Sequence, residues 1–107
     1  MSFHVTLVPR AQHDIAEIHE WIRSRSPEGA DRWRLALNKA LERLEHNPEF
    51  YGLAEEDQLV EDEIREFLFK TRRGRVFRGI FTVDENEVFV LHVRSSERGP
   101  LAADEIL

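Results

Sequence analysis

Residues 76–94 read VFRGIFTVDENEVFVLHVR and predict two strands joined by a tight turn. Val, Ile, Phe and Leu dominate both halves of this stretch, as they do in strands that pack into a sheet. Between the halves, Asp84-Glu85-Asn86 consists of polar residues that suit a turn. A connection this short requires the two strands, at about 76–83 and 87–94, to be antiparallel neighbours.

Two further strands are predicted before this hairpin. One covers about residues 64–70, and the turn-prone run Arg72-Arg73-Gly74-Arg75 connects it to the hairpin. The other lies at the N-terminus, where Phe3, Val5 and Leu7 alternate with polar residues. This period of two is typical of a strand with one buried face.

The chain between the first strand and the others predicts two helices. Pro9 suits the first turn of a helix over about 9–25, and Ser26-Pro27 marks the start of a second helix that extends to about His46. The first apolar stripe consists of Ala11, Ile15, Ile18 and Ile22. The second consists of Ala30, Trp33, Leu37, Ala40, Leu41 and Leu44. Because each helix has one apolar stripe, we expect both to pack on a common surface.

The resulting order, β-α-α-β-β-β, predicts an α+β fold in which a helical hairpin packs on one face of a small antiparallel sheet. The opposite face is expected to be open to solvent or to a partner. Residues 48–63 are expected to form a loop with a helical turn near 54–59, and the tail is expected to add a helical turn within 101–107. A chain of 107 residues predicts one domain, 1–107.

The composition of the chain bears on disulfides, on metal sites and on the compartment in which we expect the protein. The chain has no cysteine, which excludes disulfides and Cys-ligated metals. Neither a signal peptide nor a long apolar segment is recognisable, so we expect a cytoplasmic protein that does not enter the membrane. The acids match no calcium loop and the histidines no zinc spacing, so no metal and no cofactor are predicted.

Charge is distributed unevenly along the chain. The formal net charge of −6 argues against a protein that coats nucleic acid with its whole surface. Residues 55–66 contain seven acids and one arginine, whereas residues 70–78 contain five basic residues and no acid. The arginines at 72, 73 and 75 flank a turn, where they are either simply solvated or part of a binding surface.

Two polar residues inside predicted strands are candidates for function. Arg78 lies in an apolar strand, so its side chain must face solvent, an acid or a ligand, and we expect it on the open sheet face. His92 has the pKa class of a general acid or base, although a strand histidine bonded to a neighbour is the alternative. Alternation places His92 on the same face as Val90 and Arg94. Both tryptophans are expected in the core.

The order of several motifs resembles the RelE/ParE toxin superfamily of bacterial type II toxin–antitoxin modules, often labelled plasmid stabilisation proteins. The similarity covers nearly the whole chain. It includes VTLVPRA at 5–11, SPE at 26–28, GRVFR at 74–78, IFTVD at 80–84, VFVLHVR at 88–94 and Arg98 before Pro100-Leu101.

The resemblance implies a growth-inhibiting toxin that a cognate antitoxin neutralises, in a toxin–antitoxin hetero-oligomer. ParE-like members inhibit DNA gyrase by binding, whereas RelE-like members cleave mRNA on the ribosome without a metal. We favour the ParE-like alternative, because the only tyrosine is Tyr51 and the C-terminal tyrosine of many RelE-like nucleases is missing. An inert family member is a third alternative.

Site residues follow from the same resemblance. The expected partner-binding residues are Arg75, Arg78, Arg94 and Arg98. If the chain is instead RelE-like, Arg78 and Arg94 are the expected phosphate ligands, and His92 or Lys70 the expected proton-transfer group. Whether the protein is an enzyme at all depends on this choice, and a non-enzymatic toxin is the preferred alternative.

Overall fold

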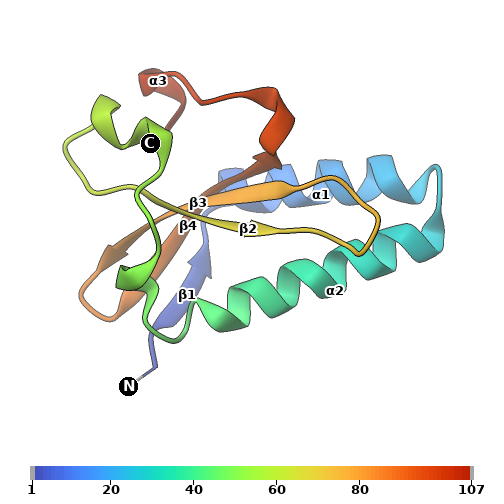
Figure 1. Cartoon of the computed structure of the whole chain (residues 1–107), viewed down its shortest axis with the longest axis horizontal. Coiled ribbons are helices and arrows are strands. Elements are labelled where there is room, and N and C mark those ends of the chain that lie inside the picture. Colours follow the sequence, from blue (N-terminus) through green and yellow to red (C-terminus); the bar gives the residue numbers. More distant parts are fainter. Residues whose placement is uncertain (1, 107) are drawn as a thin grey trace.

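The computed structural model describes residues 2–106, in which four strands form one sheet beside two long helices (Figure 1). The strands are β1 (His4–Leu7), β2 (Arg65–Phe69), β3 (Phe77–Asp84) and β4 (Glu87–Ser95). The helices are α1 (Pro9–Arg23), α2 (Pro27–Arg43) and the short α3 (Ala103–Ile106). Short 3₁₀ turns are η1 (Pro48–Phe50), η2 (Glu55–Leu59) and η3 (Ser96–Arg98). The predicted element order and the α+β class are confirmed. Met1, part of the predicted domain, and Leu107, part of the predicted domain and of the predicted C-terminal turn, lie outside the described residues.

Both long helices begin where the sequence predicts and end slightly earlier. Pro9 and Pro27 occupy first-turn positions, where the missing N–H has no helical acceptor. The Ser26 Oγ accepts a hydrogen bond of 3.0 Å from the Gly29 N–H, which caps α2. Asn47, which precedes Pro48, has a left-handed backbone with φ of 53° and turns the chain away from α2.

The sheet is mixed, whereas an antiparallel sheet was expected. Its strand order is β1-β4-β3-β2, and the pairs β2–β3 and β3–β4 are antiparallel as their short connections require. β1, however, lies parallel to β4, with Val5 opposite Val88 and Leu7 opposite Val90. No turn joins β1 to its neighbour, so turn length does not constrain its direction. The intervening helices carry the chain back and permit a parallel pair.

A β-bulge interrupts the ladder between β3 and β4. Ile80 pairs with His92 and Phe81 pairs with Val90, so Leu91 is an extra residue on β4. Alternation therefore fails here, and the three successive residues Leu91, His92 and Val93 are all buried. The prediction that Val90 shares a face with Arg94 is wrong for this reason: Val90 packs toward the helices, whereas Arg94 pairs with Arg78.

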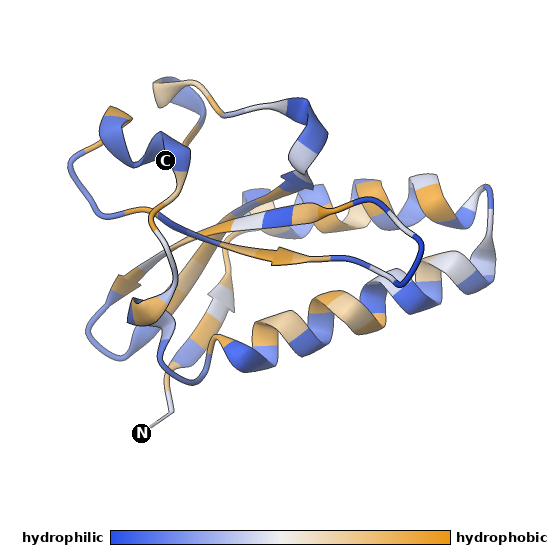
Figure 2. Ribbon diagram, viewed as in Figure 1, coloured by the Kyte–Doolittle hydropathy of each residue, from blue (hydrophilic) through white to orange (hydrophobic). Residues whose placement is uncertain are grey.

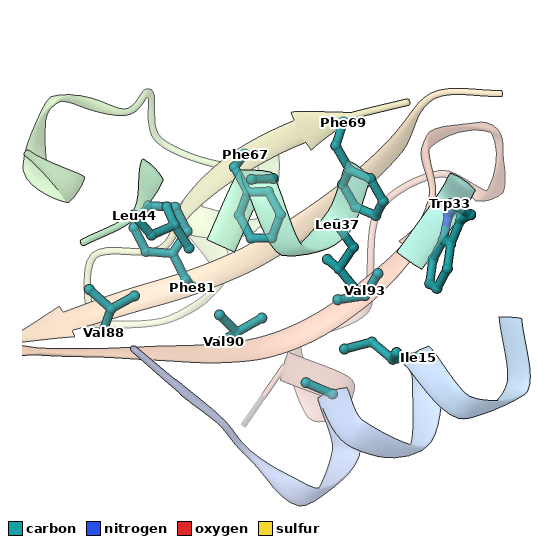
Figure 3. Close-up of a cluster of buried hydrophobic side chains, with 12 residues drawn as sticks. Ile15, Trp33, Leu37, Leu44, Phe67, Phe69, Phe81, Val88, Val90 and Val93 are labelled. Carbon is teal, nitrogen blue, oxygen red and sulfur yellow. The ribbon is translucent and has the colours of Figure 1, made fainter. Parts of the chain in front are cut away.

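The main core lies between the sheet and the helical hairpin. Hydrophobic bands recur along both helices in Figure 2, and the close-up in Figure 3 shows them meeting side chains of β2, β3 and β4. Its buried members include Ile15, Trp33, Leu37, Leu44, Phe67, Phe69, Phe81, Val88, Val90 and Val93. Trp33 contacts the rings of Phe69 and Phe77, with centroids 5.7 and 5.5 Å away. Trp33 is thus a core residue as expected, but Trp21 is 51% exposed.

The second sheet face is partly covered, which corrects the expectation that it is open. Residues from the 48–63 segment and from the C-terminal tail pack there as a smaller apolar cluster (Figure 1). This cluster consists of Ala54, Ile64, Ile80, Leu91, Leu101 and Ile106. Both covering segments lack the long periodic patterns from which packing can be predicted. What remains exposed on β2 is Leu68, with 57% of its surface accessible.

Gly79→Ala is expected to destabilise the fold. Gly79 lies on β3 directly beneath the Phe67 ring, and a Cβ at this position would overlap the ring carbons. Displacing a buried ring in a packed core costs about 1–3 kcal/mol. Thermal unfolding followed by circular dichroism should show the loss, with Gly52→Ala as the control because nothing lies within 4 Å of its Cβ position. Equal melting temperatures for the two variants would contradict this packing.

Candidate functional site

Arg78 lies in a buried cluster with two carboxylates and is not exposed. Its Nη1 and Nη2 atoms donate to the two oxygens of Glu56 at 2.7 and 2.6 Å. Nη2 also donates to Glu66 at 3.0 Å, and the Leu101 N–H donates to Glu56 at 2.8 Å. Arg78 is 6% exposed and Glu56 is fully buried. Of the three environments considered for this strand arginine, the structure shows an acid.

The hydrogen bonds of this cluster shift the pKa values of both Glu56 and Arg78. Burial alone would raise the pKa of Glu56, but the hydrogen bonds from Arg78 and Leu101 lower it to about 2. The hydrogen bonds to Glu56 also raise the pKa of the Arg78 guanidinium, against the effect of burial. One guanidinium thus faces two carboxylates. The expected exposed position of Arg78 is wrong, because η2 and the C-terminal segment cover this part of the sheet.

His92 is also inside the protein, with 3% of its surface exposed. Its Nδ1 lies 3.6 Å from Oδ2 of Asp14 on α1, and the same oxygen accepts a 3.1 Å hydrogen bond from the Val93 N–H. Arg10 donates to the other oxygen of Asp14 at 3.0 Å. Partial burial would raise the pKa of Asp14, but the contacts with His92 and Val93 lower it. The structure therefore places His92 inside the protein beside a carboxylate.

Lys70 lines a basic groove between α2 and β2, which we call the α2–β2 groove. Its volume is about 290 Å³. The lining consists of Arg32, Leu35, Ala36, Lys39, Arg43, Phe69, Lys70, Thr71 and Arg72. The α2 residues were not among the predicted site residues. Three of them are basic, Arg32, Lys39 and Arg43, and they recur at helical spacing, so a search for a basic helical stripe would have found these three.

The other three predicted partner-binding arginines converge on a second pocket. Arg75, Arg94 and Arg98 line it together with the exposed Trp21, and we call it the Trp21 pocket. Arg78 and Lys70 do not line this pocket. The five sequence-predicted cations are therefore divided among a buried cluster, the α2–β2 groove and the Trp21 pocket.

Two further properties concern the residues from 2 to 106. In this part of the chain, no three His, Asp or Glu side chains lie together in a way that would hold a metal ion. None of its helices has the length and apolar character needed to cross a membrane.

Comparison with protein families identifies the class of molecule. The model of the family described as ParE toxin of the type II toxin–antitoxin system, parDE, matches residues 5–100. The chain belongs to this family. It is the toxin component of a type II toxin–antitoxin module, and its family implies a cognate antitoxin as partner. A search of curated proteins found no match to the toxin.

Arg78→Ala is expected to destabilise the toxin strongly. The substitution leaves Glu56 as a buried carboxylate without its counter-charge, which typically costs about 3–5 kcal/mol. Urea unfolding followed by circular dichroism measures this loss. Arg23→Ala serves as the control, because Arg23 pairs with Glu20 on an exposed helix surface and should change stability little. An Arg78→Ala protein as stable as the parent would contradict the buried pair.

The stability of the toxin is expected to depend on pH through Glu56. Because the folded-state pKa of about 2 lies below the usual 4.5, the stabilisation is complete above about pH 4.5 and is lost as pH falls toward 2. Glu56→Gln cannot titrate at this position. The stability difference between parent and variant should therefore shrink by about 3 kcal/mol over this range. A difference that stays constant in urea titrations across these pH values would exclude the depressed pKa.

Proposed function

We propose that the toxin acts by binding DNA gyrase, as ParE-like proteins do, and does not cleave RNA. The observation that carries this proposal is the neutralisation of Arg78 by Glu56 and Glu66. RNA cleavage needs a cation that stabilises the crowded phosphate and a group that transfers protons. The Arg78 Nη atoms already donate to carboxylates, and a phosphate would have to displace them from a buried site.

The position of His92 supports the same proposal. A general acid or base must reach the proton that it transfers, directly or through one water. His92 is buried and faces Asp14, so a substrate on the surface would not reach it in this conformation. Lys70 and Arg94 remain nearer to solvent, but they line different recesses of the toxin. A binding mechanism requires no such catalytic set.

The α2–β2 groove is the surface that we propose for the antitoxin. β2 is an edge strand of the sheet. Among the described residues, only the beginning of its outer edge is paired: Leu53 bridges to Arg65, and the Glu66 N–H donates to the Gly52 carbonyl. The exposed Leu68 follows on the same strand. A partner can add a strand to an exposed sheet edge. Acidic residues on such a segment would complement the five cations of the groove.

Two assays with the purified toxin test the gyrase proposal against the nuclease alternative. In the first, gyrase-dependent DNA supercoiling is measured with increasing toxin, and we expect inhibition. In the second, the toxin is added to a translation extract and the message is analysed, and we expect it to remain intact. Cleaved message with unimpaired supercoiling would overturn the proposal in favour of a RelE-like nuclease. Activity in neither assay would favour an inert family member.

The antitoxin provides the control for the same assays. Adding the antitoxin should restore supercoiling to the extent that it binds the toxin. Lys39→Gln combined with Arg43→Gln removes two charges of the α2–β2 groove and should require more antitoxin for the same relief, whereas Arg23→Gln, on α1 outside the groove, should not. If the antitoxin relieves inhibition by the parent toxin, the double variant and Arg23→Gln equally well, it binds outside the α2–β2 groove. The gyrase proposal would not be affected.

A further inference from the structure

The Trp21 pocket is a separate recess at the end of the sheet. β1 pairs only with Glu87–Val90 of β4, so the later part of β4 has no strand on that side, and α1 runs past it. The recess has a volume of about 330 Å³. It is lined by Glu17, Ile18, Trp21, Arg75, Phe77, Arg94, Ser95 and Arg98, none of which belongs to the α2–β2 groove.

Positive charge in this pocket is poorly compensated. Among residues 2–106, no ion pair within 4.0 Å involves Arg94 or Arg98, and Arg75 reaches Glu97 only at 3.9 Å. The Nε of Arg94 is buried without a hydrogen-bond partner, and one Nη makes a long contact of 3.4 Å with the Arg98 carbonyl. Burial lowers the pKa of Arg94, and the neighbouring Arg98 lowers it further. A ligand carboxylate would relieve this repulsion.

Apart from Glu17 and Ser95, the rest of the pocket lining is apolar. Ile18, Trp21 and Phe77 form its wall, and half of the Trp21 surface is exposed. An exposed tryptophan beside unpaired arginines has the composition of a binding hot spot, since these residue types dominate interface energetics. A bulky apolar side chain can pack against this wall while an adjacent acid reaches the arginines.

Nucleic acid fits the pocket less well than an acidic peptide. Glu17 and Glu97 add negative charge beside the arginines, and the whole chain has a net charge of −6. A phosphate backbone is repelled by such surroundings, whereas one or two carboxylates on a short peptide need only the local arginines.

We infer that the Trp21 pocket is a docking site for a segment of a partner protein in which a bulky apolar side chain adjoins acidic residues. The apolar side chain packs against Trp21 and Phe77, and the carboxylates pair with Arg94 and Arg98. This site goes beyond the proposed function, because it does not depend on the toxin's target. It also lets the toxin engage two protein segments on separate residues, one here and one in the α2–β2 groove.

A peptide titration tests this inference on the purified, isotope-labelled toxin. The probe is the capped peptide Gly-Ser-Leu-Asp-Glu-Gly-Ser, and binding is followed by nuclear magnetic resonance. We expect shifts at the Trp21 indole N–H and at the Arg94 and Arg98 amides, with a millimolar or tighter dissociation constant. Peptides with serine in place of leucine, or with amides in place of both acids, should each bind at least about tenfold more weakly.

Variants of the toxin complete the test. Arg98→Gln changes an exposed residue and should weaken binding several-fold, Arg94→Gln should do the same, and Arg23→Gln should have no effect. Melting curves show that each variant is folded. The inference is overturned by an absence of shifts at millimolar peptide, by equal binding of the amidated peptide, or by shifts confined to the α2–β2 groove. It is equally overturned if a thymidine dinucleotide binds the pocket more tightly than the peptide, which would indicate a phosphate site.

Discussion

The ion pair between Glu56 and Arg78 holds together parts of the chain that are far apart in sequence. Taking both charges out of water is costly, and the cost is offset only because two short hydrogen bonds join them and others come from Leu101 and to Glu66. Through these bonds β3 fixes η2, and η2 fixes the C-terminal segment over the sheet. The smaller apolar cluster, which includes Ile64 and Leu101, draws its residues from these same segments and from the sheet.

The same interaction defines what kind of surface the toxin presents. An arginine that would be a phosphate ligand on an open sheet becomes a structural residue once two carboxylates enclose it. The other four predicted cations lie elsewhere, Lys70 in the α2–β2 groove and Arg75, Arg94 and Arg98 in the Trp21 pocket. An acidic protein can therefore still offer two concentrated basic surfaces to acidic partners.

Local patterns predicted the elements well, because apolar periodicity and turn residues act over a few positions. The helices around Ile15 and Leu37 and the hairpin at Asp84 are of this kind. Two features escaped prediction because each depends on distant residues. The direction of β1 is set by two helices, and the burial of Arg78 by an acid 22 positions away. For His92, a position beside a neighbouring side chain was one of the two alternatives, but its neighbour Asp14 lies on another element and could not be named. The bulge at Leu91 added a third error, since one extra residue reverses the alternation that follows it.

The parallel pairing of β1 with β4 has a consequence for how the chain acquires its structure during synthesis. Val5 and Val88 meet across most of the length of the chain, so the first strand has no partner until the last strand has left the ribosome. Contacts of such long sequence separation slow folding, because a large loop must close before they form. The Trp21 pocket, to which β4 contributes Arg94 and Ser95, is assembled only in this late step. During synthesis the Trp21 pocket therefore stays unformed until the residues up to Arg98 have emerged from the ribosome.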